Sequence, residues 1–97
     1  MRLLITPAAL DDISRIDVYL EARSPPGAER VRLEIDETMQ MLLDYPYLGR
    51  KQRRKGIRKI GTSKYAYLIY YRVDETNEEV VVMTVQHKSR RRRFKDA

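Results

Sequence analysis

The sequence predicts an α+β fold in which the elements follow the order β-α-α-β-β-β and a helical hairpin packs on one face of a small, mostly antiparallel sheet. Two stretches in the first half repeat apolar residues at helical spacing, and two in the second half are rich in Tyr, Ile and Val. The 97 residues contain no cysteine. We therefore expect one domain over residues 1–97, with a single core and no disulfide.

The first predicted helix follows a short strand over residues 2–5. Thr6 and Pro7 mark its start, because a hydroxyl cap followed by proline at the first helical position is a strong initiation signal. Its apolar face consists of Ala9, Ile13, Ile16 and Leu20. Asp11 and Asp12 are predicted to lie off that face.

The second predicted helix runs over residues 28–44. The Ser-Pro-Pro-Gly segment at residues 24–27 is expected to break the chain before it. Its inner face consists of Ala28, Val31, Ile35, Met39 and Leu42. Two amphipathic helices joined by so short a break most simply form an antiparallel hairpin, and the second half of the chain must cover its apolar stripe.

Three strands are expected to provide that cover, with the last two joined by a turn over residues 74–78. They span residues 57–61, 65–73 and 79–87. Residues 47–55 are predicted to form a loop between the helices and the sheet. Residues 88–97 are a basic tail that either continues as a short helix or remains mobile.

The middle of these strands carries four tyrosines, at positions 65, 67, 70 and 71. Aromatic rings on a sheet can stack on nucleobases, as they do in single-strand RNA binders. Tyr65, Tyr67 and Tyr71 share one face of the strand, however, and a row of large residues on a central strand is typical of a floor under helices. We therefore predict that these tyrosines belong to the core.

Positive charge is concentrated in the second half of the chain. Residues 1–49 carry nine acidic and five basic side chains, whereas residues 50–97 carry five acidic and 15 basic ones, within a net charge of +6. Two clusters hold most of the cations: Arg50, Lys51, Arg53, Arg54, Lys55, Arg58 and Lys59, and then Lys88, Arg90, Arg91, Arg92, Arg93 and Lys95. If the last strand lies beside the strand of Arg58, the two clusters converge. Such a field favours an anionic partner, including nucleic acid.

Membrane, metal and cofactor functions are not expected from this sequence. The longest apolar run, residues 65–71, is far shorter than the roughly 20 residues that span a bilayer, and the lack of cysteine favours a reducing cytoplasm. His87 is the only histidine, with no carboxylate pair beside it for a metal site. At a strand end it either hydrogen-bonds a loop or acts as a general base.

Three apolar residues fall outside the inner helical faces. They are Val18, Leu33 and Met41. Isolated exposed aliphatic side chains are ordinary. Together on the outside of a helical hairpin, these three suit the apolar surface of a protein partner.

Five segments, in this order, resemble the RelE/ParE toxin superfamily. They are TPAALDDI (6–13), DYPYLGR (44–50), GIRKI (56–60), YLIYYRV (67–73) and TVQHK (84–88). The resemblance covers nearly the whole chain. It implies the small toxin of a type II toxin-antitoxin module, held inactive by a cognate ParD-like antitoxin encoded beside it.

The superfamily divides into two mechanisms. The resemblance implies either a RelE-like ribosome-dependent messenger RNA endonuclease or a ParE-like poison of DNA gyrase. Where the RelE pattern has an arginine and a tail tyrosine, this chain has Leu68 and Phe94. Lys59 and Lys88 match basic positions of that pattern, and His87 can substitute for the missing proton-transfer group.

Three local patterns favour the ParE-like branch. They are the Gly-x-Arg pattern that ends at Arg58, the Pro-x-Leu-Gly-Arg loop and the Val-x-His strand end. The leading hypothesis is a toxin that inhibits gyrase without catalysing bond cleavage. Its predicted target contacts are Arg58, His87, Arg90, Arg91, Arg92, Arg93 and Phe94. The antitoxin is predicted to lie across the helical hairpin at Val18, Leu33 and Met41, or along a sheet edge by strand addition.

Two alternatives remain open. In the RelE-like alternative, His87 is the acid or base while Lys59, Arg58 and Lys88 hold the phosphate. In the other, the chain is a plain nucleic-acid-binding domain whose affinity falls steeply with salt.

Overall fold

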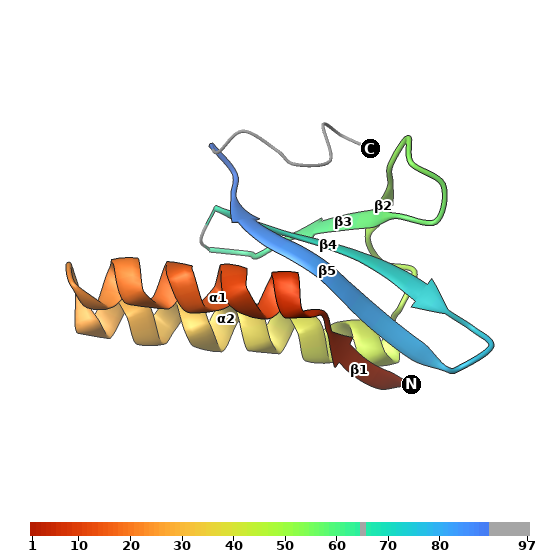
Figure 1. Ribbon diagram of the computed structural model, residues 1–97, viewed down its shortest axis with the longest axis horizontal. Helices are drawn as coiled ribbons and strands as arrows, with labels where there is room; N and C mark the ends of the chain where they lie inside the picture. Colours follow the sequence, from red (N-terminus) through yellow and green to blue (C-terminus); the bar gives the residue numbers. More distant parts are fainter. Residues whose placement is uncertain (65, 90–97) are drawn as a thin grey trace.

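Two antiparallel helices form one layer of the molecule, and a twisted sheet forms the other (Figure 1). The computed structural model describes residues 1–64 and 66–89. In these residues the elements are β1 (Arg2–Ile5), α1 (Pro7–Glu21), α2 (Pro25–Asp44), β2 (Arg50–Lys51), β3 (Arg58–Gly61), β4 (Tyr67–Asp74) and β5 (Glu79–His87). The predicted α+β fold, with the helical hairpin on one face of the sheet, is confirmed.

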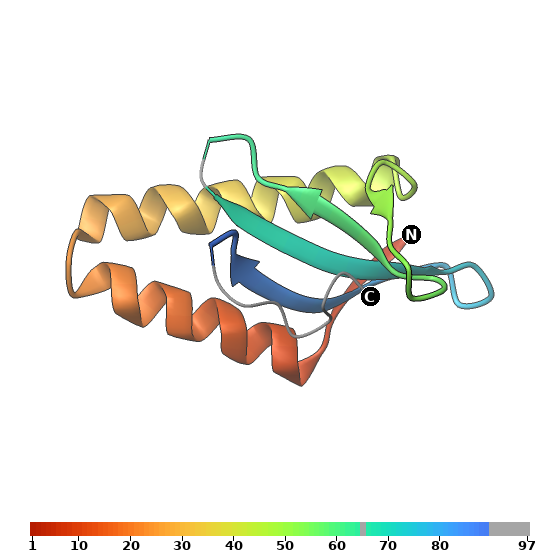
Figure 2. The same ribbon diagram turned by 90° about the horizontal axis from the view of Figure 1, so that it is seen from above.

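The strands lie in the order β1-β5-β4-β3-β2. β1 runs parallel to β5, and every other neighbouring pair is antiparallel. Figure 2 shows the β4–β5 hairpin lying over the helical hairpin, whose α1–α2 turn extends beyond the ends of the strands. The last strand does not lie beside the strand of Arg58, which was the condition for the two basic clusters to converge, because β4 pairs with both strands and lies between them.

Both helices begin at a proline that follows an N-cap residue with a hydroxyl side chain. The Thr6 hydroxyl accepts a hydrogen bond from the Ala9 amide, and the Ser24 hydroxyl accepts one from the Gly27 amide, each at 3.2 Å. α2 therefore starts at Pro25 and not at residue 28 as predicted. A proline in the first turn lacks only an N–H that would have no partner there, so residues 25–27 extend the helix instead of breaking the chain.

The prediction that residues 47–55 form a loop is partly wrong, because they include the short strand β2. Arg50 pairs with Lys59 and Lys51 with Arg58, so β2 forms the edge of the sheet. A strand of two residues is too short to show a period-two pattern in the sequence.

The core lies between the helices and the inner face of β4 and β5. Its buried members are Ala9, Val31, Ile35, Met39, Tyr67, Ile69, Val82 and Val85, with a neighbouring cluster of Leu42, Tyr71 and Val80. The predicted role of Tyr67 and Tyr71 as a floor under the helices is confirmed. Tyr65 lies outside the described residues. Tyr70 faces the opposite side of the sheet, where it packs with Ile57 and Leu68.

Asp12 points toward the sheet, although the sequence places it off the apolar face of α1. Its side chain accepts hydrogen bonds from the Thr84 hydroxyl and, at 3.1 Å, from the Val85 amide, and the residue is only 6% exposed. The register between β4 and β5 shifts at this level, leaving Met83 without a partner on β4. The carboxylate of Asp12 thus joins α1 to β5 where the ladder is irregular.

We predict that Asp12→Ala lowers the free energy of unfolding by about 2–4 kcal/mol, because the Val85 amide and the Thr84 hydroxyl lose a buried acceptor. Urea unfolding followed by circular dichroism measures this change. Asp11→Ala is the matched control. It removes only an exposed pair with Arg15 and should change stability by less than about 0.5 kcal/mol. Equal effects of the two substitutions would contradict the assigned role of Asp12.

Candidate functional site

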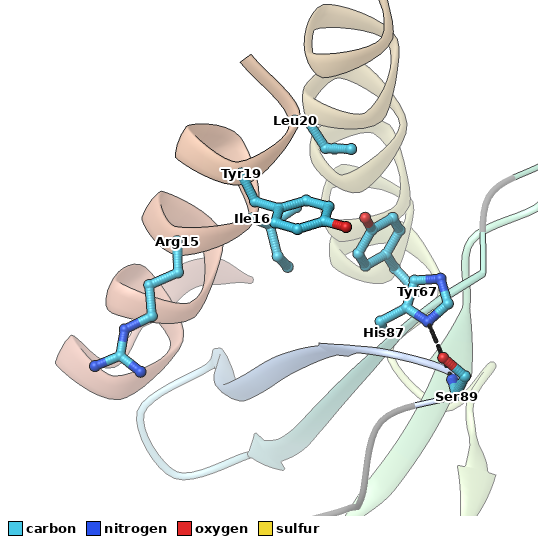
Figure 3. Close-up of a pocket in the computed structure, with 7 residues that line it drawn as sticks. All are labelled: Arg15, Ile16, Tyr19, Leu20, Tyr67, His87 and Ser89. Carbon is cyan, nitrogen blue, oxygen red and sulfur yellow. Dashed lines mark hydrogen bonds between the residues drawn. The ribbon is translucent and has the colours of Figure 1, made fainter. Parts of the chain in front are cut away.

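A pocket of about 520 Å³ opens where α1 extends past the end of β5 (Figures 1 and 3). It is lined by Arg15, Ile16, Tyr19, Leu20, Tyr67, His87 and Ser89. α1 supplies four of these residues, and the paired ends of β4 and β5 supply Tyr67 and His87. The pocket therefore combines an apolar floor with aromatic walls and a few polar groups, the composition that ligand pockets generally have.

His87 is held at the mouth of this pocket by the residue two positions later. Its Nδ1 atom lies 2.7 Å from the Ser89 hydroxyl and accepts a hydrogen bond from the Ser89 amide at 3.1 Å. Because a backbone N–H can only donate, the neutral ring carries its proton on Nε2. The imidazole also meets the Tyr67 ring edge to face, with centroids 5.2 Å apart. Of the two predicted alternatives for His87, the loop contact is the one observed.

Tyr19 and Tyr67 form the aromatic walls, and in Figure 3 their hydroxyl groups point toward one another. Burial raises the pKa of Tyr67, and the Tyr19 phenol adds to the effect, so Tyr67 stays a neutral hydrogen-bond donor. The Arg23 guanidinium lies 3.7 Å from the centre of the Tyr19 ring. Arg15 on α1 lines the pocket, and Arg23, just past the end of α1, lies over the ring of Tyr19.

A second candidate surface is the basic hairpin, which we define as residues 50–59. Its exposed cations are Arg50, Lys51, Arg53, Arg54 and Lys55. The turn is fixed by hydrogen bonds from the Gln52 amide to the Ile57 carbonyl and from the Gln52 side chain to the Arg50 carbonyl. Gly56 takes a φ of 82°, a left-handed conformation that favours glycine. The cations are therefore presented on an ordered turn.

Tyr71 and Arg58 clamp the segment that leads into the basic hairpin. The buried Tyr71 hydroxyl donates to the Pro46 carbonyl and accepts from the Gly49 amide, both at 2.8 Å. Arg58 Nη1 donates to the carbonyls of Tyr47 and Gly49 at 3.1 and 2.8 Å. A Cβ at Gly49 would lie 2.6 Å from the Tyr71 hydroxyl, so the close approach requires glycine.

The predicted site residues fall at different ends of the sheet. Arg58 pairs with Tyr71 and His87 pairs with Tyr67, which are four residues apart on β4, or about 13 Å along the strand. Lys88 follows β5 at the end near His87, and Lys59 lies in β3. Arg90 to Phe94 lie outside the described residues. Of the second basic cluster only Lys88 belongs to the described residues, so the convergence of the two clusters stays a prediction.

Val18, Leu33 and Met41 are exposed as predicted, at 66%, 56% and 40%. The same outer side of the helical hairpin carries charged groups. Arg32 on α2 contacts Asp17 and Glu21 on α1 at 2.5 and 3.3 Å, and its guanidinium pKa is raised, chiefly by the hydrogen bond to Asp17. Antitoxin binding by the three apolar residues stays a prediction.

Sequence reasoning missed three residues of the pocket: Arg15, Tyr19 and Ser89. Arg15 and Tyr19 are four positions apart, a spacing that places them on one flank of a helix beside the apolar face. That spacing is the one sequence signal for these two residues. The other side of the pocket comes from the ends of β4 and β5, more than 45 residues away in the chain, so the sequence alone could not show it.

Within residues 1–64 and 66–89, no group of three or more His, Asp or Glu side chains could hold a metal ion. No helix in this part of the chain is long and apolar enough to cross a membrane.

A model of the family described as ParE toxin of type II toxin-antitoxin system, parDE, matches residues 3–92. The Sinorhizobium fredii protein named "Putative toxin Y4kP" is 33% identical over 86 residues, which are 89% of this chain and 86% of that protein. The solved chromosomal ParDE system from P. aeruginosa has a chain with a TM-score of 0.77 at 20% identity, covering 90% of this chain and 95% of that one. The E. coli RelBE toxin-antitoxin complex has a chain with a TM-score of 0.70 at 20% identity, covering 93% of this chain and 98% of that one.

The fold and the matches together define a toxin of a type II toxin-antitoxin system, within the RelE/ParE superfamily that the sequence resembles. Within that superfamily, the chain belongs to the ParE toxin family.

We predict that Tyr71→Phe lowers the free energy of unfolding by about 1–3 kcal/mol, because the Gly49 amide loses its buried acceptor. Gly49→Ala should destabilise at least as much, since its Cβ meets the Tyr71 ring. Tyr45→Phe, at a 64% exposed tyrosine, is the control and should stay within about 0.5 kcal/mol. Chemical denaturation measures all three. An unchanged free energy of unfolding in Tyr71→Phe would show that the Tyr71 hydroxyl does not hold the loop.

Stability should also fall as the pH rises above about 10, the ordinary pKa of tyrosine. Burial raises the pKa of Tyr67 and of Tyr71, so both phenols are fully protonated, and their stabilisation complete, below that pH. Above it, the unfolded chain releases these protons first and unfolding is favoured. Urea midpoints at about pH 8 and about pH 11 test this. The loss of stability at high pH should be smaller in Tyr71→Phe. A urea midpoint that does not change with pH in the unsubstituted chain would contradict this prediction.

Proposed function

We propose that this chain is a ParE-like toxin that stops growth by inhibiting DNA gyrase and is neutralised by a cognate ParD-like antitoxin. The observation that carries the proposal is the match to the ParE toxin family over residues 3–92, which includes both helices and the whole sheet. Gyrase acts in the cytoplasm, so the proposal also assigns the toxin to that compartment.

The placement of the cations supports inhibition by binding instead of RNA cleavage. Cleavage needs an acid or base and cations fixed around one phosphate. His87 pairs with Tyr67 and Arg58 pairs with Tyr71, which are four residues apart on β4. Arg58 also donates to two loop carbonyls. Leu68, where the RelE pattern has an arginine, is buried against Ile57 and Tyr70.

We assign target contact to His87, Arg58 and the tail segment Arg90 to Phe94, and we add to them the exposed cations of the basic hairpin. Arg58 donates to the carbonyls of Tyr47 and Gly49 through Nη1, so its other N–H groups can face a partner. Arginine and aromatic side chains are the residue types enriched at binding hot spots. Clustered cations also speed association with an acidic or DNA-bound surface.

An antitoxin partner is supported by the solved structures that this fold resembles, which include a ParDE system and RelBE toxin-antitoxin complexes. The net charge of +6 adds a physical reason. A stoichiometric partner that masks this charge is expected to be acidic, because binding surfaces are complementary in potential.

The RelE-like alternative is favoured by one observation, the imidazole of His87 at the mouth of a pocket with its proton on Nε2. In that state Nε2–H can donate a hydrogen bond to a substrate, and only the doubly protonated ring could act as the general acid. This alternative predicts cleaved messages in translating extracts.

The purified toxin is expected to inhibit supercoiling of relaxed plasmid by gyrase. Reversing two cations of the basic hairpin with Arg53→Glu and Lys55→Glu should raise the inhibitory concentration by about tenfold or more, because charge complementarity is lost. Arg30→Glu is the matched control, a charge reversal at an exposed arginine on α2, and should leave inhibition within about twofold.

Uninhibited gyrase together with intact toxicity in cells would contradict the proposal. His87→Ala separates the two mechanisms by magnitude. Loss of a binding contact should weaken inhibition by about tenfold, whereas loss of a general acid or base should lower messenger RNA cleavage by about 10²- to 10⁴-fold.

A further inference from the structure

We propose that the loop between α2 and β2, together with the side chain of Arg58, is a rigid contact surface for the protein target of the toxin. Tyr45 and Leu48 of this loop pack on an apolar patch of the target, and Arg58 pairs with a carboxylate beside that patch. The inference rests on the proposed function only for the existence of a protein target, and it does not depend on that target being gyrase.

Exposed apolar side chains are concentrated at the end of α2 and in the loop that follows it. Met41, Tyr45, Tyr47 and Leu48 fall within eight residues, and each is at least 40% exposed. Figures 1 and 2 place this segment at the end of the molecule away from the α1–α2 turn. Single exposed apolar side chains are ordinary, but a group of them on one short segment is typical of a contact surface.

The loop is held in one conformation from both ends. The Tyr45 amide donates to the Met41 carbonyl at 3.0 Å, and the Leu48 amide donates to the Tyr45 carbonyl at 3.1 Å, so the chain turns directly out of the helix. The buried Tyr71 hydroxyl fixes the other end through its two hydrogen bonds to the loop backbone. Because a rigid loop has little conformational entropy to lose on binding, its apolar contacts contribute more of their free energy to affinity.

Tyr47 ties the loop to two other segments of the toxin. Its hydroxyl donates to the Glu75 carboxylate in the β4–β5 turn, and the guanidinium carbon of Arg58 lies 4.9 Å from the centre of its ring. The hydrogen bond to Glu75 raises the pKa of Tyr47, so the phenol stays protonated and keeps this contact. Tyr47 is therefore engaged within the toxin, whereas Tyr45 and Leu48 remain more than half exposed and can meet a partner.

Arg58 presents an oriented edge of its guanidinium beside the loop. Nη1 has two N–H groups, and it donates to two carbonyls, those of Tyr47 and Gly49. The other edge, made of Nε–H and an N–H of Nη2, carries two parallel donors that match the two oxygens of a carboxylate. Because the loop carbonyls and the Tyr47 ring orient this edge before binding, the ion pair that it forms is geometrically specific.

The charges around the loop favour a protein over a nucleic acid as the partner. Asp44 ends α2 directly before the loop, and Glu75 lies against Tyr47. These carboxylates repel a phosphate backbone, and Arg58 already lies over the Tyr47 ring, which limits its use for base stacking. On its other side the loop leads into the basic hairpin. A surface with both signs of charge beside apolar groups suits a folded protein surface.

The first arm of the test is growth arrest by the full-length toxin in cells, with the toxin level measured by immunoblot. Tyr45→Ala and Leu48→Ala should each raise the level needed for arrest by about tenfold or more, because each removes an apolar anchor. Tyr45→Phe keeps the ring, and Leu10→Ala repeats the leucine change at a similarly exposed position on α1. Both controls should stay within about twofold. Urea midpoints should be unchanged in all four variants.

The second arm is inhibition of gyrase supercoiling by the purified toxin at low and at high salt. Tyr45→Ala and Leu48→Ala should raise the inhibitory concentration by the same factor at both. Arg58→Gln should weaken inhibition mainly at low salt, because salt screens the ion pair with a carboxylate. Equal weakening by Arg58→Gln at both salt concentrations would contradict the ion pair, since that is the result expected if Arg58 only holds the loop.

Three results would overturn the proposed surface. Full toxicity of both Tyr45→Ala and Leu48→Ala would exclude the loop from target contact. Binding of the toxin to a DNA duplex that Tyr45→Ala abolishes, with inhibition unchanged, would make nucleic acid the occupant. Self-association that Leu48→Ala abolishes, with toxicity unchanged, would make a second copy the occupant.

A failure of the proposed function gives a different result. If the unsubstituted toxin leaves gyrase uninhibited while Tyr45→Ala and Leu48→Ala lose toxicity in cells, gyrase is not the target. The loop is then still the surface that meets the target.

Discussion

Burial of the central strand β4 on both faces is the constraint on which the rest of the structure depends. Residues 67–71 are all buried, with Tyr67, Ile69 and Tyr71 under the helices and Leu68 and Tyr70 on the other side. Because the strand cannot move without opening both layers, the side chains at its ends are fixed in place. Tyr67 forms a wall of the pocket at one end of the strand, and Tyr71, in the middle of the strand, holds the loop before the basic hairpin.

This arrangement separates two surfaces that differ in chemistry. The pocket is apolar, with donors at its mouth, and it lies against a helical layer whose outer side is acidic. The basic hairpin is an ordered turn rich in arginine and lysine, held by Tyr71 and Arg58. A toxin that must bind one partner for most of its life and another after release can use such a division.

Much of the fold follows from local patterns, whereas the site depends on tertiary contacts. The periodicity of Ala9, Ile13, Ile16 and Leu20 and the β-rich stretches predict both layers. Asp12 could not be placed from α1 alone, because its partners belong to an irregular part of β5. The position of β4 between β5 and β3 is likewise a property of the whole sheet, and it separates His87 on β5 from Arg58 on β3.

The central claim is that β4 holds His87 and the basic hairpin in place for contact with the target, and hydrogen exchange measured by mass spectrometry tests it most directly. The account predicts that gyrase slows amide exchange in residues 50–58 and near His87. Unchanged exchange in both places when gyrase is bound would contradict it.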